Sequence, residues 1–323
     1  MSSRLIVSAG DPAGIGPEIT VRALADPAVR GLGEIAVAGD PDQLSELAAR
    51  FGVPVPAVEP AGDASAVRPG ELSAAGGRAA VAAITRAVEL IQQGRYDAIV
   101  TAPINKEALR LAGFEWPGHT EMLADLAGAR DVRMLLVSGA LRVVHVTTHR
   151  SLRSAIDGAT RDRVLRTIEL AGAAGQLLGT EHPRIAVAGL NPHAGEGGLF
   201  GDEEIREITP AVEAARVAGF DVSGPWPPDT VFWRASRGDF DVVVAMYHDQ
   251  GHIPVKLAGF EDGVNVTLGL PFPRTSVDHG TAFDIAGKGV ARWDSMIAAL
   301  RVAARMTGAG RTDAGSSGRA EPE

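Results

Sequence analysis

Short, uninterrupted apolar runs that stop at polar turns are the feature that most constrains the fold of this chain. Three of them cover residues 141–146, 184–190 and 241–246. Runs of this length predict strands that are buried on both faces, as in parallel sheets. Helical periodicity fills other stretches, such as residues 160–178 and 202–218. The alternation predicts an α/β fold with a mainly parallel sheet and helices on both of its faces.

A histidine follows each of the three runs within a few residues, at His149, His193 and His248. Ligands of open α/β sheets bind just beyond the carboxyl ends of strands. Three neutral imidazoles at that edge suit Zn²⁺, Mn²⁺ or Co²⁺, with one coordination position left open. We therefore expect these histidines to bind a metal ion. A lone histidine is more often structural, so we expect His145 to be a core residue and His182 to lie in a surface turn.

Residues suited to binding anions gather in the C-terminal third of the chain. Arg274 lies in the stretch PFPRTSVDHG, and Asn265 opens the strand-like run VNVTLGL. Lys256 follows an expected strand end, and lysines are rare in this chain, where most of the 31 basic residues are arginines. An arginine that binds bidentately and a nearby lysine that acts as a point charge suit a phosphate or a carboxylate. A salt bridge that stabilises a loop is the alternative interpretation.

Three further positions have open interpretations. His119, in PGHTE at an expected helix start, can hydrogen-bond a substrate oxygen or cap the helix. Asp229, in the stiff stretch PWPPDT, can accept a proton, orient a metal ligand or cap a helix. The glycine-rich residues 10–16 fit neither the dinucleotide fingerprint nor the P-loop. They form either an anion-binding turn or a tight strand-to-helix turn.

Composition excludes several classes of protein. A net charge of −9 argues against a general nucleic-acid surface, and no run reaches the ~18 apolar residues of a membrane span. The absence of cysteine leaves only nitrogen and oxygen ligands for a metal ion. The N-terminus lacks the pattern of a signal peptide, so we expect a cytoplasmic enzyme. Residues 307–323 are small and polar, which predicts a disordered tail.

Several motifs, in order along the chain, resemble those of the 4-hydroxythreonine-4-phosphate dehydrogenase family. They are GDPAGIGPEI, TAPINKEAL, PGHTE, TTHRSL, NPHAGE, YHDQG and GVNVTLGLPFPRTSVDHGTA. The resemblance implies a two-lobed α/β/α fold similar to isocitrate and isopropylmalate dehydrogenases. We expect residues 1–130 plus 286–306 to form one lobe and residues 131–285, with the histidines, to form the other. The resemblance also implies a homodimer with its active site at the subunit interface.

The resemblance implies roles for residues whose motifs match. The metal ligands would be His149, His193 and His248, and the residues near the reacting centre would be His119 and Asp229. The implied substrate contacts are His119, Thr120, Lys256, Asn265 and Arg274. The implied cofactors are NAD and a divalent metal ion (Zn, Mg, Co or Mn).

The implied activity is an NAD-dependent oxidative decarboxylation of a 4-phosphorylated four-carbon hydroxy acid. A hydride leaves the carbon that bears a secondary hydroxyl, and the resulting β-keto acid loses CO₂. A divalent ion would act as a Lewis acid, and a bound phosphate would orient the substrate. The base could be Asp229, a water on the metal or a histidine.

The family includes an enzyme of pyridoxal phosphate biosynthesis, which acts on 4-phosphooxy-threonine, and a branch that acts on threonate or erythronate 4-phosphate. Residues 251–254 and 280–287 look more like the sugar-acid branch. Two other classes remain open from the residues alone. One is a metal-dependent aldolase or phosphatase without redox chemistry, and the other is a metabolite-binding protein without activity.

Overall fold

The computed structural model describes residues 2–259 and 263–308, and these residues form an 11-stranded sheet. The strands lie in the order β3-β2-β1-β4-β11-β10-β5-β6-β9-β7-β8. Their bounds are β1 Arg4–Ser8, β2 Glu34–Gly39, β3 Ala57–Pro60, β4 Ala98–Thr101, β5 Arg133–Ser138, β6 Leu141–His145, β7 Ile185–Ala188, β8 Val222–Trp226, β9 Val242–Ala245, β10 Val264–Leu268 and β11 Arg274–Val277.

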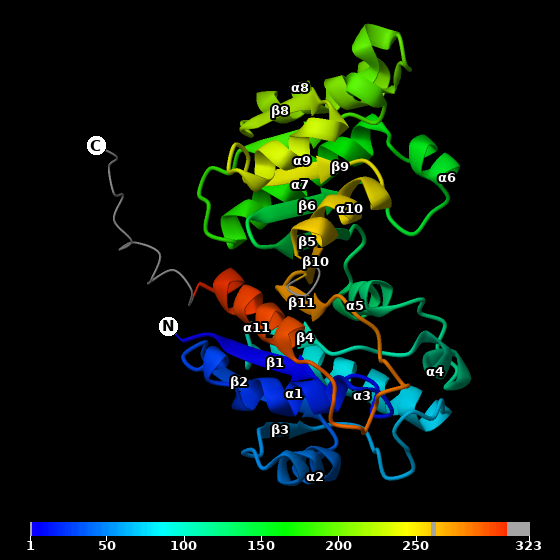
Figure 1. The fold of residues 1–323 in the computed structure, drawn as a ribbon, viewed down its shortest axis with the longest axis vertical. Helices are drawn as coiled ribbons and strands as arrows, with labels where there is room; N and C mark the ends of the chain where they lie inside the picture. Colours follow the sequence, from blue (N-terminus) through cyan, green and yellow to red (C-terminus); the bar gives the residue numbers. More distant parts are fainter. Residues whose placement is uncertain (1, 260–262, 309–323) are drawn as a thin grey trace.

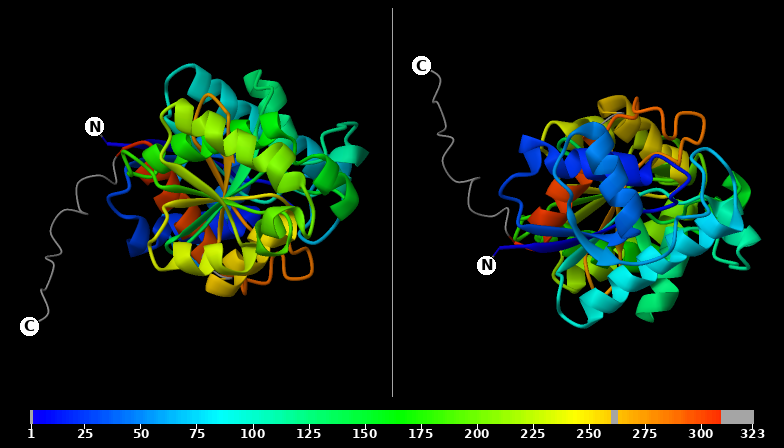
Figure 2. Two further views of the ribbon diagram at one scale, coloured as in Figure 1. Left: turned by 90° about the horizontal axis from the view of Figure 1, so that it is seen from above. Right: turned by 90° about the horizontal axis from the view of Figure 1, so that it is seen from below.

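Helices pack on both faces of this twisted sheet, as Figures 1 and 2 show. The α-helices are α1 Gly16–Ala25, α2 Pro41–Phe51, α3 Ala74–Gln92, α4 Lys106–Leu111, α5 His119–Ala127, α6 Leu152–Asp157, α7 Arg161–Leu177, α8 Thr209–Val217, α9 Pro228–Ser236, α10 His248–Ala258 and α11 Asp294–Met306. Short helical turns are η1 Pro27–Val29, η2 Pro192–Gly198 and the π-helical η3 Glu204–Ile208. The predicted α/β fold with a mainly parallel sheet is confirmed.

The direction of the sheet changes at its centre. β10 runs antiparallel to both β11 and β5, and β5 runs antiparallel to β6. All other strand pairs among the described residues are parallel. The three apolar runs of the sequence are β6, β9 and β7, which lie side by side and parallel. Their carboxyl ends, and the turns that carry the histidines, therefore meet at one edge of the sheet.

Local sequence signals explain where elements begin and end. The Asp40 side chain accepts hydrogen bonds from the N–H groups of Asp42 and Gln43 and so caps α2, which stops at the left-handed Gly52. Ser73 caps α3 in the same way. The helix expected over residues 202–218 is instead divided into the π-helical turn η3 and α8.

The C-terminal helix α11 returns to the N-terminal half of the fold, where it packs against β1, β4 and β11 (Figure 1). We propose that residues 1–130 plus 286–306 form one lobe and residues 131–285 the other. The tail expected from residue 307 falls almost wholly on residues 309–323, which lie outside the described residues. Within the described part of the chain, no helix has the length and apolarity needed to cross a bilayer.

Candidate active site

A cleft of about 680 Å³ lies over the central strands, where the direction of the sheet changes. Its walls come from α4, α5, the start of β5, the end of β6, the start of α7, and β10 and β11. Five residues that the sequence marks as substrate or metal binders line this one cleft: His119, Thr120, His149, Asn265 and Arg274. The cleft is rich in cationic side chains, namely Lys106, Arg133, Arg150, Arg163 and Arg274, against the carboxylates of Glu121 and Asp278.

Arg274 is a buried cation held by neutral groups. Its side chain is 2% exposed, and its guanidinium donates hydrogen bonds to the hydroxyls of Thr101 and Thr267 at 2.6 and 2.8 Å. No carboxylate hydrogen-bonds it within the described residues. Burial lowers the pKa of Arg274 to about 9, so the group stays charged at neutral pH. A desolvated cation without a paired anion favours binding of an anionic ligand, because the ligand replaces the lost solvation of the charge.

His119 begins α5, as the sequence predicts, and it has a free ring nitrogen. Its Nε2 is buried and makes no hydrogen bond within the described part of the chain. Burial, followed by the charge of Arg274, lowers the pKa of His119 well below its ordinary value. The imidazole is therefore neutral, and its unpaired nitrogen is available to a ligand in the cleft.

His149 and His248 lie close together at the edge predicted from the sequence. Their ring centroids are 5.5 Å apart, which allows both imidazoles to bind one ion. Nδ1 of His248 lies 2.7 Å from Oδ1 of Asp249. A carboxylate on one ring nitrogen leaves the other free to bind a metal and fixes the orientation of the ring. His149 has a φ of 41°, a strained conformation typical of functional positions.

His193 does not join this pair within one chain. It lies in η2, where its ring packs near Phe200 at 6.1 Å between centroids. The described residues of a single chain contain no group of three His, Cys, Asp or Glu side chains arranged to bind a metal ion. His149 and His248 thus fit a metal ion as two of its ligands. The described residues of one chain therefore do not bring the three predicted histidines together.

The turn that carries His193 is left-handed. Five consecutive residues, His193–Gly197, have positive φ values between 44° and 81°. Three of them are not glycine, and each costs roughly 1–2 kcal/mol in this conformation. Such strain persists only where neighbouring groups enforce it.

The carboxylate of Glu204 anchors the residues that lead into this turn. It is 3% exposed, and one oxygen accepts hydrogen bonds from the N–H groups of Leu190 and Asn191, both at 2.7 Å. Its other oxygen accepts from Nδ2 of Asn191 at 2.9 Å. Glu204 opens η3, so the π-helical turn brings this carboxylate to the base of the strained segment. The NPHAGE motif therefore depends on a residue outside it.

We expect Glu204→Gln to loosen the left-handed turn, because an amide cannot accept all three hydrogen bonds. Amide hydrogen exchange at residues 189–198 should accelerate about tenfold, measured by mass spectrometry on the intact protein. The matched control is Glu213→Gln, which removes an exposed carboxylate from α8. Equal exchange in both variants would show that Glu204 does not hold the turn.

Two further histidines, His252 and His145, pack next to His248. The ring of His252 stacks on that of His248 at 3.5 Å between centroids, and its Nδ1 donates to the backbone carbonyl of His248. His145 lies 4.7 Å from His252 and is buried, as the sequence predicts. Burial lowers the pKa of His145 to about 3, so this ring stays neutral. The contact between His252 of α10 and His145 of β6 packs this helix against the strand.

Gly251 allows α10 to approach His145. A Cβ at this position would lie 2.3 Å from Nε2 of His145 and 2.8 Å from a methyl group of Val143. We expect Gly251→Ala to lower the free energy of unfolding by about 1–3 kcal/mol, although alanine is the better helix former. Urea denaturation checks this. The loss should shrink in a His145→Ala background, and an equal loss in both backgrounds would contradict the steric explanation.

The other predicted residues lie at or beyond the margins of the cleft. Lys256, in the last turn of α10, pairs with Asp278 at 3.0 Å, and Asp278 lines the cleft. His248 lines a smaller hollow of about 310 Å³ that shares His149 with the main cleft. Asp229 is exposed in the first turn of α9 and does not line the cleft. His182 is exposed in a bend, as expected.

The glycine-rich residues 10–16 form a tight turn between β1 and α1. The N–H of Ala13 binds the Asp11 carboxylate, that of Gly14 binds the Asp11 carbonyl, and that of Ile15 binds the Thr281 carbonyl. These donors are therefore already satisfied by the protein. Of the two interpretations that the sequence left open, the structural turn is the one supported.

Several residues that line the cleft were not predicted from the sequence. Arg150 directly follows His149 in TTHRSL, so its position could have been noticed. Arg133 and Arg163 belong to no motif. Arg133 reaches the cleft as the first residue of β5, and Arg163 reaches it because α7 packs against the end of β6. Lys106, at the start of α4, belongs to the TAPINKEAL motif, but the motif assigned it no role.

A mainly parallel α/β sheet with a polar cleft at its strand ends is the architecture of an α/β metabolic enzyme. Residues 32–303 match the family model described as pyridoxal phosphate biosynthetic protein PdxA. The chain belongs to this family, whose members are dehydrogenases.

Curated relatives span nearly the whole chain. A D-threonate 4-phosphate dehydrogenase of Pectobacterium atrosepticum is 48% identical, over 95% of this chain and 100% of its own length. A 4-hydroxythreonine-4-phosphate dehydrogenase of Beijerinckia indica is 52% identical, over 94% of each chain. A crystal structure of the Klebsiella pneumoniae 4-hydroxythreonine-4-phosphate dehydrogenase is 48% identical with a TM-score of 0.88, covering 95% of this chain and 98% of that one.

Proposed function

We propose that this protein is a nicotinamide-dependent dehydrogenase that oxidises and decarboxylates a 4-phosphorylated four-carbon hydroxy acid, with NAD as the hydride acceptor. One observation carries the proposal. A single cleft holds the buried Arg274, hydrogen-bonded by hydroxyls alone among the described residues, together with His149, which lies beside His248. This arrangement suits a substrate with an anionic group at one end and an oxidisable hydroxyl at the other.

The residues of the proposed site have different roles in binding and in catalysis. Arg274, with Asn265 and Lys256, binds the phosphate, and this anchor fixes the distance of the reacting carbon from the acceptor. The neutral His119, with Thr120, hydrogen-bonds substrate oxygens. The oxidation removes a hydride from carbon and a proton from the hydroxyl, and the β-keto acid then loses CO₂. The proton is accepted by a histidine, by Asp229 or by water.

A divalent metal ion bound by His149, His193 and His248 would supply Lewis-acid stabilisation of the negative charge that develops on oxygen. Because His193 lies apart from the other two within one chain, we propose a homodimer in which each site takes His193 from the opposite subunit. Exposed apolar side chains next to His193 favour such contact, because Leu199 is 73% and Phe200 48% exposed. Asp229 lies on α9, which contacts the η2 turn that carries His193, so the opposite subunit would supply both residues.

Within this class we propose D-threonate 4-phosphate as the preferred substrate. The alternative, 4-phosphooxy-threonine, carries an ammonium group where threonate carries a hydroxyl. The described lining of the cleft has five cationic side chains against two carboxylates, and this positive field disfavours an ammonium group. Several relatives also carry the D-threonate name.

The test is turnover by purified protein supplied with NAD and a divalent metal ion. We expect NADH and CO₂ to form in equal amounts, with a higher kcat/KM for D-threonate 4-phosphate than for 4-phosphooxy-threonine. A reversed preference would place the protein in the pyridoxal phosphate pathway. Metal-dependent bond cleavage without NADH would contradict the proposal and favour an aldolase or a phosphatase.

A further inference from the structure

The cleft contains more positive charge than the proposed phosphate anchor uses. Arg274 belongs to β11, at the centre of the sheet, whereas Arg150 and Arg163 come from the turn after β6 and from the start of α7. Separate elements thus bring guanidinium groups to one cleft. The substrate has two anionic groups and NAD has a pyrophosphate, so a second anion position has a chemical use.

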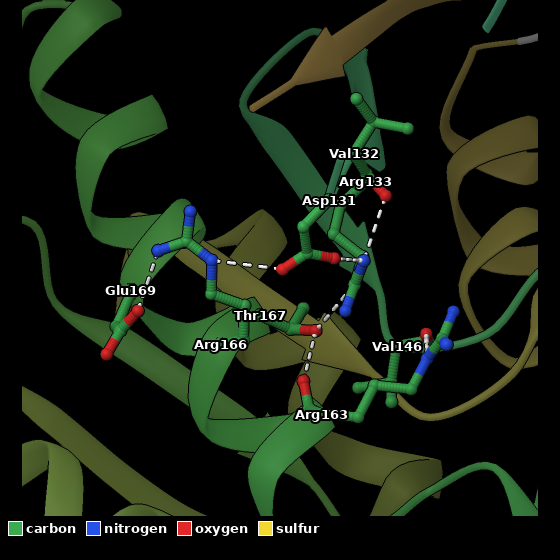
Figure 3. Close-up of polar contacts among 8 residues, drawn as sticks. All are labelled: Asp131, Val132, Arg133, Val146, Arg163, Arg166, Thr167 and Glu169. Carbon is green, nitrogen blue, oxygen red and sulfur yellow. Dashed lines mark hydrogen bonds and ion pairs between the residues drawn. The ribbon is translucent and has the colours of Figure 1, made fainter. Parts of the chain in front are cut away.

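Arg163 is fixed in place through one nitrogen only. Its Nε donates to the backbone carbonyl of Val146 at 2.7 Å, which ties α7 to the end of β6 (Figure 3). Its two terminal nitrogens make no hydrogen bond within the described part of the chain. The hydrogen bond from Nε is enough to tie α7 to β6. The terminal nitrogens, each with two N–H donors, therefore remain available to a ligand.

Arg150 is not paired with a carboxylate among the described residues, nor is Arg163. Asp131, whose charge acts on Arg163, already pairs with Arg133 and Arg166, and Arg166 also binds Glu169 (Figure 3). Burial, and then the charges of Arg133 and Arg150, lower the pKa of Arg163. Like charges held together raise the free energy of the unliganded protein, and a bound anion relieves that repulsion.

We propose that Arg150 and Arg163 form a second anion subsite that binds a phosphoryl group. Two molecules could bring such a group to the cleft. One is the dinucleotide, through its pyrophosphate, and the other is the substrate, whose phosphate would then lie at this subsite rather than at Arg274. Two guanidiniums from different elements can clamp a phosphoryl group with several charge-assisted hydrogen bonds. This inference deepens the proposed function and rests on it for the identity of the ligand.

Arg150→Gln and Arg163→Gln test the subsite by titration calorimetry on the full-length, metal-supplemented protein. Arg153→Gln is the matched control, because it removes an exposed arginine from α6 that does not line the cleft. The probes are D-threonate 4-phosphate, D-threonate and NAD. We expect each cleft variant to weaken binding of one phosphoryl ligand about tenfold or more relative to the control.

The probes identify the source of the phosphoryl group. Weaker binding of D-threonate 4-phosphate, with no change for D-threonate or NAD, assigns the subsite to the substrate phosphate. Weaker binding of NAD alone assigns it to the cofactor. Affinities equal to those of Arg153→Gln for all three probes would overturn the proposal. Arg150→Gln decides the matter if Arg163→Gln fails to fold, because Arg150 makes no backbone contact like that of Arg163 with Val146.

Failure of the proposed function is distinguishable from failure of the subsite. Binding that depends on Arg150 in a protein without NADH formation would retain the subsite and remove the dehydrogenase activity. Turnover that none of the three substitutions affects would retain the dehydrogenase activity and remove the subsite.

Discussion

Replacement of His248 by alanine is expected to lower kcat/KM by about a thousandfold or more and to remove the bound metal ion. The reason is the position of the ring, 5.5 Å from His149 between centroids and fixed by Asp249. A site that loses one of three protein ligands loses both affinity and the geometry on which Lewis-acid stabilisation depends. Metal content by elemental analysis and steady-state turnover measure the two effects.

The control for this variant is His182→Ala, which removes an exposed histidine from a surface bend. The control should keep its metal ion and its activity. Unchanged turnover in His248→Ala would mean that His248 has no part in catalysis, whatever ion the protein contains. Lost turnover with an unchanged metal content would place the ion elsewhere.

Arg274→Met should separate stability from function. Binding of the phosphorylated acid should weaken about a hundredfold or more, because the desolvated cation that attracts the phosphate is gone. The free energy of unfolding should nevertheless rise by about 1–3 kcal/mol at pH 7, because a buried charge with no carboxylate bound to it is replaced by an apolar chain of similar length.

The pH dependence gives this prediction a second readout. In the folded protein the pKa of Arg274 is lowered to about 9, so the cost of the buried charge is fully present below that pH. As the pH rises above 9, the folded wild type loses the proton before the unfolded chain does and gains stability. The advantage of Arg274→Met should therefore narrow between pH 9 and pH 11. A less stable variant at pH 7 would show that the bonds to Thr101 and Thr267 outweigh the cost of burial.

The sequence predicts the parallel part of the fold and one edge of the site well. Residues 141–146, 184–190 and 241–246 are apolar enough to be buried on both faces, and they are adjacent parallel strands in the structure. The antiparallel central strands were not predicted, because the alternation in VNVTLGL indicates a strand but not its direction.

Features that depend on distant contacts were also missed. The residues that lead into the left-handed turn at His193 are anchored by Glu204, which lies outside the NPHAGE motif. The arginines at the cleft wall depend on how α7 packs against β6. No local pattern of residues carries that information. The separation of His193 from the other two histidines is likewise a property of the tertiary fold.

The most direct test of the shared three-histidine site is complementation between two inactive subunits. His193→Ala and His248→Ala homodimers should each lack a complete site, and each should lack metal and activity. A mixed dimer of the two contains one site with all three histidines. We predict about one metal ion per mixed dimer and about half the turnover of the wild type. A mixed dimer as inactive as its parents, or a His193→Ala homodimer with its full metal content, would contradict the account.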